Sequence, residues 1–220
     1  MMDNTNGIQN GQIRPSKPSV VIAFIWIVAF ITFNIVQLIC AMAWGEPGFD
    51  WRMSTIGALG ETQNPCSEIM NYAFMFQGAV IVIGIWVMKP LWRKSIFTTP
   101  ARVLLSLYGL AFIIFGYFPQ DIAPSTHYLL GIIPLILFGA TGLVVAGIAM
   151  NHDRFTVLWI VTALLGIIAL LFGFLYYIEI NFGMGKGLME RTWMYMPLIW
   201  SFLIAISTLR ADSKPAKKKT

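Results

Sequence analysis

Residues 20–42 read VVIAFIWIVAFITFNIVQLICAM and contain no Asp, Glu, Lys or Arg. About 20 apolar residues in a helix span the hydrocarbon core of a bilayer, because each residue adds about 1.5 Å to the length of the helix. The run is longer than the apolar region of a signal peptide, and no small-residue cleavage site follows it. We therefore expect these residues to form a transmembrane helix that stays in the mature protein.

Five further apolar runs follow along the chain, at residues 69–88, 101–118, 128–150, 155–178 and 193–209. The composition agrees with this pattern: 57% of the 220 residues are hydrophobic, only 11% are charged, and the mean hydropathy is +0.72. A soluble domain carries roughly 25% charged residues, so this composition excludes an ordinary cytosolic enzyme. The sequence predicts an all-α integral membrane protein, a bundle of six transmembrane helices.

The six runs predict one membrane domain between two polar tails. We expect a cytoplasmic tail at residues 1–18, the membrane domain at residues 19–210 and a basic cytoplasmic tail at residues 211–220. Residues 43–68 form an outer loop that is unusually long, since most connections have about 4 to 6 residues. This loop is too apolar for a solvated linker, so we expect it to be ordered.

Within the outer loop, Met53, Ile56 and Leu59 recur at three-residue spacing. This spacing predicts a short helix that lies on the membrane surface or enters the mouth of the bundle.

Positive charges predict which side of the membrane each loop occupies, because Lys and Arg in short loops resist translocation. Only Arg52, Lys186 and Arg191 lie on one side of the six predicted spans, and the other twelve of the 15 Lys and Arg lie on the side of both termini. We therefore expect both termini in the cytoplasm, and a location in a cell inner membrane or plasma membrane. The net charge of +5 follows from this topology, so the expected partner is the lipid bilayer and not nucleic acid.

Acidic residues have the opposite distribution and concentrate on the outer side. Seven of the ten lie there: Glu46, Asp50, Glu61, Glu68, Asp121, Glu179 and Glu190. Polar chemistry is therefore expected at the outer mouth of the bundle.

Three sequence blocks carry a family resemblance. They are residues 47–60, with PGFDWRMS followed by IGALG, residues 116–121, GYFPQD, with His127 after them, and residues 187–191, GLMER. Taken in this order, the blocks resemble the six-helix prokaryotic membrane family catalogued as domain of unknown function number 998. The resemblance covers about residues 20–210.

The resemblance implies a fold and a set of polar positions, and it implies no activity. The matching positions in this chain are Asp50, Arg52, Ser54, Asp121, His127, Glu190 and Arg191. The predicted topology brings them from three separate loops to the outer mouth. We expect a polar vestibule there that binds a lipid, an amphiphile or a protein partner without catalysis.

The alternative is a membrane-embedded hydrolase that acts on a lipid or lipid-linked substrate at the outer leaflet. Ser54, His127 and Asp121 supply the composition of a nucleophile, base and orienting acid, although the sequence lacks the G-x-S-x-G elbow. A transporter is a weaker third interpretation. No charged residue falls at the middle of a predicted span, which argues against a proton-driven pump.

A purely structural interpretation of the same positions is a network of ion pairs that ties the loops together, since charges near hydrocarbon need partners. In that network Arg191 would meet Asp50, Asp121 or Glu68, and Glu190 would meet Arg52.

No metal or cofactor is expected. A zinc site from His127, Asp121 and Glu190 is chemically allowed, but one histidine with two scattered carboxylates has no diagnostic spacing. The only two cysteines, Cys40 and Cys66, form no CxxC pair. Both are expected toward the same membrane face, and the sequence leaves open whether they form a disulfide.

Overall fold

The computed structural model describes residues 8–9, 12–13 and 15–212. Within them, six helical segments are long and apolar enough to cross a membrane, which confirms the predicted all-α, multi-pass bundle. The helices are α1 (Lys17–Met42), α2 (Ser67–Val87), α3 (Thr98–Tyr117), α4 (Pro124–Thr126), α5 (Ile133–Ala149), α6 (Leu158–Tyr177) and α7 (Lys186–Asp212), with β1 (Ile8–Gln9) and β2 (Gln12–Ile13) paired before α1. Most of the two predicted tails lies outside the described residues.

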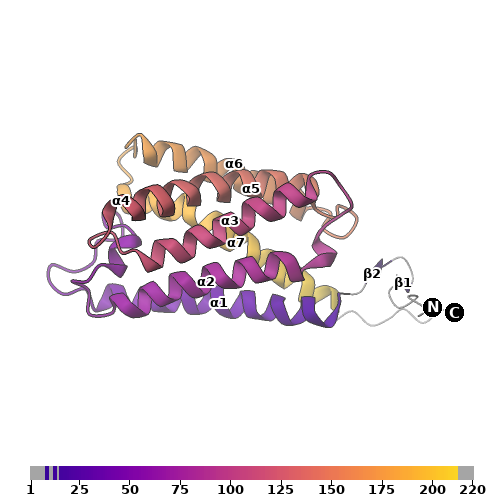
Figure 1. Cartoon of the computed structure of the whole chain (residues 1–220), viewed down its shortest axis with the longest axis horizontal. Coiled ribbons are helices and arrows are strands. Elements are labelled where there is room, and N and C mark those ends of the chain that lie inside the picture. The colour runs from indigo at the N-terminus through magenta and orange to yellow at the C-terminus, as the bar shows by residue number, and fades with distance from the viewer. Residues whose placement is uncertain (1–7, 10–11, 14, 213–220) are drawn as a thin grey trace.

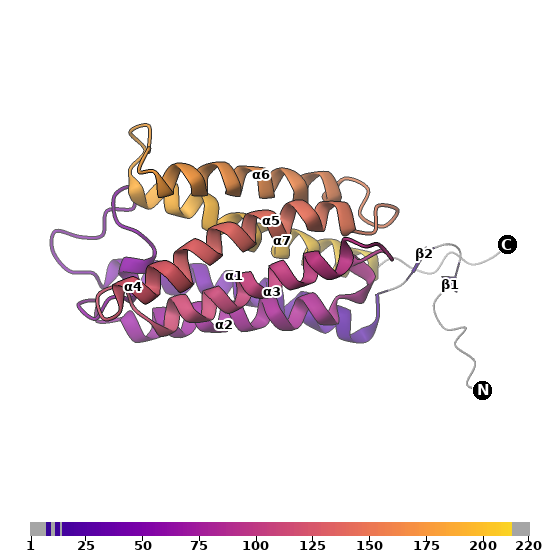
Figure 2. The same cartoon turned by 45° about the horizontal axis from the view of Figure 1, so that its top comes forward.

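The long helices form a closed ring in which each packs on the next (Figure 1, Figure 2). α1 packs on α2, α2 on α3, α3 on α5, α5 on α6, α6 on α7 and α7 back on α1. α7 also packs on α5, so it lies partly inside the ring. After six crossings, α7 ends at the end of the bundle where α1 begins. We call this the termini end, and the opposite end the distal end.

Aromatic rings fill the centre of the bundle. Phe33 is 1% exposed, and its ring centroid lies 5.6 Å from that of Phe74 and 5.8 Å from that of Phe112. Lipid tails are as apolar as these side chains, so close packing rather than exclusion from water holds membrane helices together. A Cβ on Gly109 would lie 2.8 Å from the carbonyl oxygen of Gly78, so glycine at this position lets α2 and α3 approach closely.

The fourth span is irregular where it reaches the distal end. The span Pro124–Ala149 contains a π-helical turn at His127–Ile132 between α4 and α5. Pro134, in the first turn of α5, has no N–H to donate to the carbonyl of Leu130, which favours an irregular turn at this point. Such turns occur frequently at functional sites, and this one begins at a histidine.

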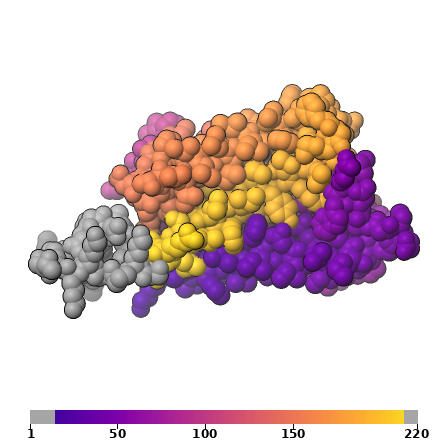
Figure 3. Space-filling model, turned by 180° about the vertical axis from the view of Figure 1, so that it is seen from behind, coloured from indigo at the N-terminus to yellow at the C-terminus, as the bar shows by residue number. Residues whose placement is uncertain are grey.

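The outer loop folds back against the distal end of the bundle. It contains the predicted short helix as a 3₁₀ helix at Gly57–Gly60. Ile56 and Leu59 are fully buried, whereas Met53 is 59% exposed, so only two of the three apolar positions enter the bundle mouth. The space-filling view from behind shows the loop, in purple, standing at the same end as the orange-yellow start of α7 (Figure 3).

Candidate functional site

The outer loop begins its contact with the bundle by capping α7. The carbonyl oxygen of Arg52 accepts hydrogen bonds from the backbone N–H groups of Gly187, at 2.8 Å, and Leu188, at 3.2 Å. The first N–H groups of a helix have no partner within the helix, so this carbonyl satisfies two of them. The guanidinium of Arg52 also donates to the carbonyl of Gly183 at 2.8 Å. Arg52 therefore joins the loop to the segment before α7 and to its first turn.

Arg191 holds the same stretch of loop from the side of α7. Its Nη1 donates to the carbonyl oxygens of Trp51 at 3.1 Å, Ser54 at 2.9 Å and Gly187 at 2.9 Å. The guanidinium carbon lies 5.4 Å from the ring centroid of Phe49 and 5.0 Å from that of Trp51. A planar guanidinium can stack on rings and donate from its edge at the same time, which a lysine ammonium cannot do.

Glu190 secures the next part of the loop from inside the bundle. Its side chain is 1% exposed, and its carboxylate accepts a hydrogen bond from the backbone N–H of Ile56. The N–H of Gly57 also donates to this carboxylate. Burying a carboxylate is costly unless hydrogen bonds compensate, and the N–H groups at the start of the 3₁₀ helix supply them.

His127 packs against Gly57 of the outer loop. Its side chain is 2% exposed, its Nδ1 is 2.8 Å from the carbonyl oxygen of Phe118, and its ring centroid is 4.1 Å from that of Phe115. Because Nδ1 faces an acceptor, the proton belongs on Nδ1, and Nε2 is left as an acceptor. This Nε2 is buried without a hydrogen-bond partner in the described residues. A Cβ on residue 57 would lie 3.3 Å from it, so glycine makes room for the imidazole.

Asp121 fastens the tip of the outer loop to the connection after α3. Its Oδ2 accepts hydrogen bonds from the backbone N–H of Thr62 at 2.8 Å and from the Thr62 hydroxyl at 2.5 Å. Slight burial raises the pKa of Asp121. The two Thr62 bonds and the nearby backbone N–H groups outweigh that effect, so the pKa lies below its ordinary value.

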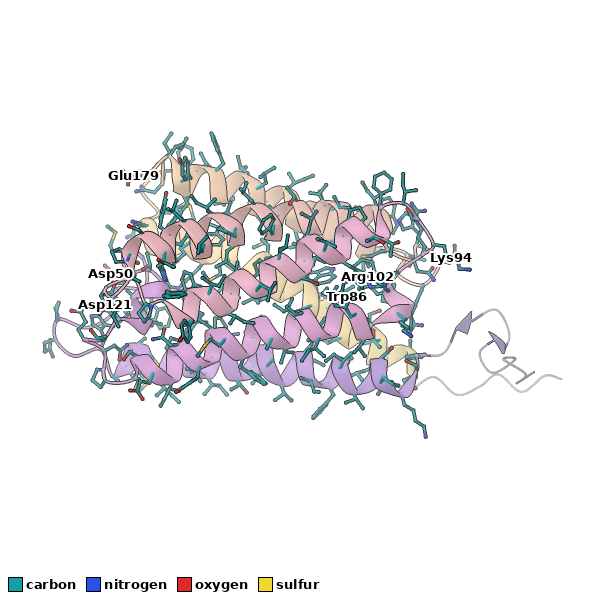
Figure 4. All side chains as sticks on the ribbon, viewed as in Figure 1. Asp50, Trp86, Lys94, Arg102, Asp121 and Glu179 are labelled. Carbon is teal, nitrogen blue, oxygen red and sulfur yellow. The ribbon has the colours of Figure 1, made fainter. Side chains whose placement is uncertain are left out.

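Asp50 and Ser54 shape the turn that Arg191 holds. The carboxylate of Asp50 accepts from the N–H groups of Arg52 at 2.8 Å and Met53 at 3.3 Å, an arrangement typical of Asx turns. The N–H of Ser54 donates to the carbonyl of Asp50 at 2.7 Å. All seven predicted positions thus belong to the distal end, and Figure 4 shows Asp50 and Asp121 there together with Glu179.

The predicted network of ion pairs is wrong. Within the described residues, Arg52 and Arg191 bond to backbone carbonyls instead of carboxylates. Adjacent positions on a helix point about 100° apart, so Glu190 faces Ile56 while Arg191 faces the turn. Neutral carbonyl and N–H groups of the loop therefore take the place of the oppositely charged partners that we expected.

The hydrogen bonds of a Ser-His-Asp triad are not formed. In the described part of the chain, His127 bonds to Phe118 and Asp121 to Thr62, and no hydrogen bond joins Ser54 to His127. Nor do the described residues contain a group of three His, Cys, Asp or Glu that could hold a metal ion. Both cysteines are free thiols, and the Sγ of Cys40 donates to the carbonyl oxygen of Cys66 at 3.4 Å.

A cleft of about 410 Å³ opens beside His127, between the π-helical turn, the end of α6 and the start of α7. It is lined by Gln120, Pro124, Ser125, His127, Tyr128, Leu129, Ile132, Tyr176 and Lys186. A second hollow of about 290 Å³ shares Tyr176 and Lys186 with it and adds Glu179, Ile180, Asn181 and Met189. The ammonium of Lys186 lies 5.7 Å from the ring centroid of Tyr176.

Most residues that line this cleft lie outside the seven predicted positions. Of the seven predicted positions only His127 lines it, and Lys186, the one formally charged residue in its lining, was not among them. A signal existed, because Lys186 is one of just three cations on the outer side of the predicted spans. Tyr176 gives no comparable signal, because tyrosine and tryptophan are common at the membrane–water interfaces of membrane proteins in general.

Comparison with protein families identifies a match for this chain. The family model described as "Protein of unknown function (DUF998)" matches residues 20–207. No curated protein and no solved structure matches the chain. The match extends from the first turn of α1 to the last turns of α7, and so includes the outer loop, the π-helical turn and the cleft. The chain is therefore a multi-pass membrane protein that belongs to the DUF998 family of proteins of unknown function.

Proposed function

We propose that this protein binds a lipid or another amphiphile at its distal end, with the headgroup in the cleft beside His127, and that it does so without catalysis. One observation carries the proposal. The cleft combines a largely apolar wall with a single cation, Lys186, and with two neutral polar side chains, Ser125 and Gln120. Ligand sites typically have this composition, an apolar lining with a few placed polar groups.

The lining matches the two parts of an amphiphile. Ser125, Gln120 and Lys186 offer hydrogen-bond donors to a headgroup, and Lys186 favours a negative charge. Leu129 is 59% exposed and continues the lining along the helix that faces the lipid. An acyl chain lying against this face would remain in the hydrocarbon while its headgroup enters the cleft.

The outer loop is the support for this site and not part of its lining. Arg52, Arg191 and Glu190 anchor the loop to α7, and Gly57 of the loop packs on His127. Ligand binding needs groups held in fixed positions by their neighbours. We therefore assign positioning roles to the loop contacts and to His127, and binding roles to Lys186, Ser125 and Gln120.

Titration with a synthetic amphiphile tests the proposal. The probe is dodecyl phosphate, added to the protein in dodecyl maltoside, and dodecyltrimethylammonium serves as the cationic comparison. Binding to the folded state raises the unfolding temperature with ligand concentration. We expect dodecyl phosphate to raise it, dodecyltrimethylammonium not to, and Lys186→Gln to remove most of the effect.

Two further variants make the result specific. Ser125→Trp places an indole in the cleft from an exposed position, and we expect it to block the probe. Lys17→Gln removes an exposed cation at the termini end and should leave the response unchanged. Equal responses to the two probes, or a full response in both Lys186→Gln and Ser125→Trp, would refute binding in the cleft.

We also propose the orientation that the charge bias predicts, with both termini in the cytoplasm of a prokaryotic inner or plasma membrane. Single cysteines at the exposed positions Phe182 and Lys94, introduced after Cys40 and Cys66 are changed to Ser, test it. A membrane-impermeant maleimide should label Phe182→Cys in intact cells and Lys94→Cys only after permeabilisation. The reverse pattern would overturn the assignment.

A further inference from the structure

The turn between α2 and α3, at the termini end, carries a dense group of cations. Lys89, Arg93 and Lys94 lie in the turn and Arg102 follows in α3, while residues 88–102 contain no Asp or Glu. The neighbouring connection between α5 and α6 adds one acid and one further Arg at residues 153–154, so the surroundings do not neutralise the group. Figure 4 shows Lys94, Arg102 and Trp86 at this end of the bundle.

The turn has a fixed backbone. The N–H of Arg93 donates to the carbonyl of Ala149 at 3.1 Å, and the N–H of Asn151 donates to the carbonyl of Leu91 at 2.8 Å. The hydroxyl of Thr98 donates to the carbonyl of Arg93 at 2.6 Å. Because the end of α5 and the start of α3 both hold it, the turn presents its cations from a defined surface rather than from a mobile loop.

Arg102 is arranged as a binding group. Its guanidinium carbon lies 5.5 Å from the ring centroid of Trp86 and 5.6 Å from that of Trp92. Within the described residues its buried Nε has no hydrogen-bond partner. Trp86 is itself fixed, since its Nε1 donates to the hydroxyl of Ser106 at 3.0 Å, and it remains 48% exposed. Two indole rings therefore hold the guanidinium of Arg102 in a defined place, and because only its Nε is buried, the terminal Nη groups remain to donate to a ligand.

Apolar side chains beside the cations are exposed. Ile96 is 85% exposed and Phe97 is 40% exposed, and they lie two and three residues after Lys94 in the sequence. Large apolar side chains next to Lys and Arg, at the end of a membrane span, are typical of a segment that sits in the headgroup region and inserts apolar groups among the acyl chains.

We propose that the α2–α3 turn binds the headgroup of an anionic phospholipid in the leaflet at the termini end. Arg102 would donate to the phosphate from between Trp86 and Trp92, Arg93 and Lys94 would add charge, and Ile96 with Phe97 would lie among the acyl chains. Arginine matches phosphate oxygens with paired N–H donors, and basic groups at a membrane surface select anionic lipids. This site is separate from the distal cleft and does not depend on the function proposed for it.

Quenching of Trp86 by brominated lipids tests this proposal. Nanodiscs are prepared with brominated phosphatidylglycerol in unbrominated phosphatidylcholine, or with brominated phosphatidylcholine in unbrominated phosphatidylglycerol. The quenching that is due to Trp86 is the difference between the quenching of the wild type and that of Trp86→Phe. Each cation near the surface changes affinity by about fivefold, so we expect phosphatidylglycerol to be preferred by at least that factor at Trp86.

Charge variants test which cations produce the preference for phosphatidylglycerol. Arg102→Gln and the exposed double variant Arg93→Gln/Lys94→Gln should each lower it by about fivefold or more, whereas Arg102→Lys should lower it less. Lys17→Gln removes an exposed cation at the same end and is the matched control, with no change expected. Equal quenching by the two brominated lipids would overturn the site, as would a loss in Lys17→Gln as large as that in Arg93→Gln/Lys94→Gln. The exposed double variant keeps the test valid if Arg102→Gln fails to fold.

Discussion

The carboxylate of Glu190 accepts a hydrogen bond from the backbone N–H of Ile56, so the last helix holds a loop that lies 134 residues earlier in the chain. Both groups are fully or almost fully buried. The bond thus connects the first connection of the bundle to its last span at a place that water does not reach.

Glu190→Gln should destabilise the protein by about 1–3 kcal/mol, because the amide group places a donor where the loop already offers N–H donors. Thermal unfolding in detergent measures the change. Glu46→Gln alters an exposed carboxylate of the same loop and should have almost no effect. Equal unfolding temperatures for the two variants would show that the buried carboxylate does not stabilise the loop.

Arg191→Lys should loosen the turn at residues 49–54 without unfolding the bundle. A lysine keeps the charge but loses the planar contact with Phe49 and Trp51 and most of the bonds to carbonyls. Hydrogen exchange followed by mass spectrometry should show faster exchange in peptides that cover the turn, with peptides from α5 unchanged. Unaltered exchange at residues 49–54 would contradict the anchoring role of the guanidinium.

His127→Phe should destabilise the fold by about 1–2 kcal/mol. The phenyl ring keeps the contact with Phe115 but removes the donor to the carbonyl of Phe118. His152→Phe is a matched control at the other end of the bundle, where the imidazole also contacts an aromatic ring and a carbonyl but is only half-buried. We expect a smaller loss there, because water can satisfy the carbonyl. An equal or larger loss in His152→Phe would contradict this account.

Acidification should weaken the bond between Asp121 and Thr62. The pKa of Asp121 is lower in the folded protein than its ordinary value of about 3.9. The ionised carboxylate therefore stabilises the fold fully at pH values above that ordinary pKa. This stabilisation is lost as the pH falls through the lower, folded-state pKa. The difference in unfolding temperature between the wild type and Asp121→Asn should therefore shrink between pH 6 and pH 3. A difference that stays constant over this interval would exclude the carboxylate as its source.

The two cysteines should differ in their reactivity toward a maleimide, and neither should need a reductant before it reacts. Cys40 is fully buried and Cys66 is partly exposed, and both are free thiols. We expect a maleimide to label one thiol in the folded protein and two after denaturation, with the native label lost in Cys66→Ser. Denatured protein that needs a reductant before it reacts would show that the pair is oxidised.

The sequence predicts the spans well wherever hydrophobic residues run without interruption, as at residues 20–42, which become Lys17–Met42. The last span shows the limit. Its predicted start at residue 193 is seven residues late, because Lys186, Glu190 and Arg191 lower the local hydropathy. The outer loop supplies partners for Glu190 and Arg191, which lie 134 and 137 residues after Ile56 and Ser54, and local hydropathy cannot reveal partners so distant in the sequence.

The site was predicted as a location and not as a set of contacts. The predicted topology brought the seven positions to the same end. The expectation that charges near hydrocarbon form ion pairs matched Arg191 with carboxylates, whereas in the structure it bonds to carbonyls. Backbone groups look alike in every sequence, so a side chain that binds them leaves no sign in composition. The cleft at Lys186 and Tyr176 was missed for a related reason, because a hollow depends on how three helix ends are spaced.

The cap that Arg52 places on α7 also sets an order of assembly during synthesis. The carbonyl of Arg52 cannot meet the N–H of Gly187 until the ribosome has made all the intervening residues. The tip of the first connecting loop can bond to Asp121 once α3 has been made, but residues 51–56 of the same loop must wait for the last crossing before α7 can hold them. In a nascent chain that stops ahead of the last helix, these residues would be open to proteases, and completion of the last helix would protect them.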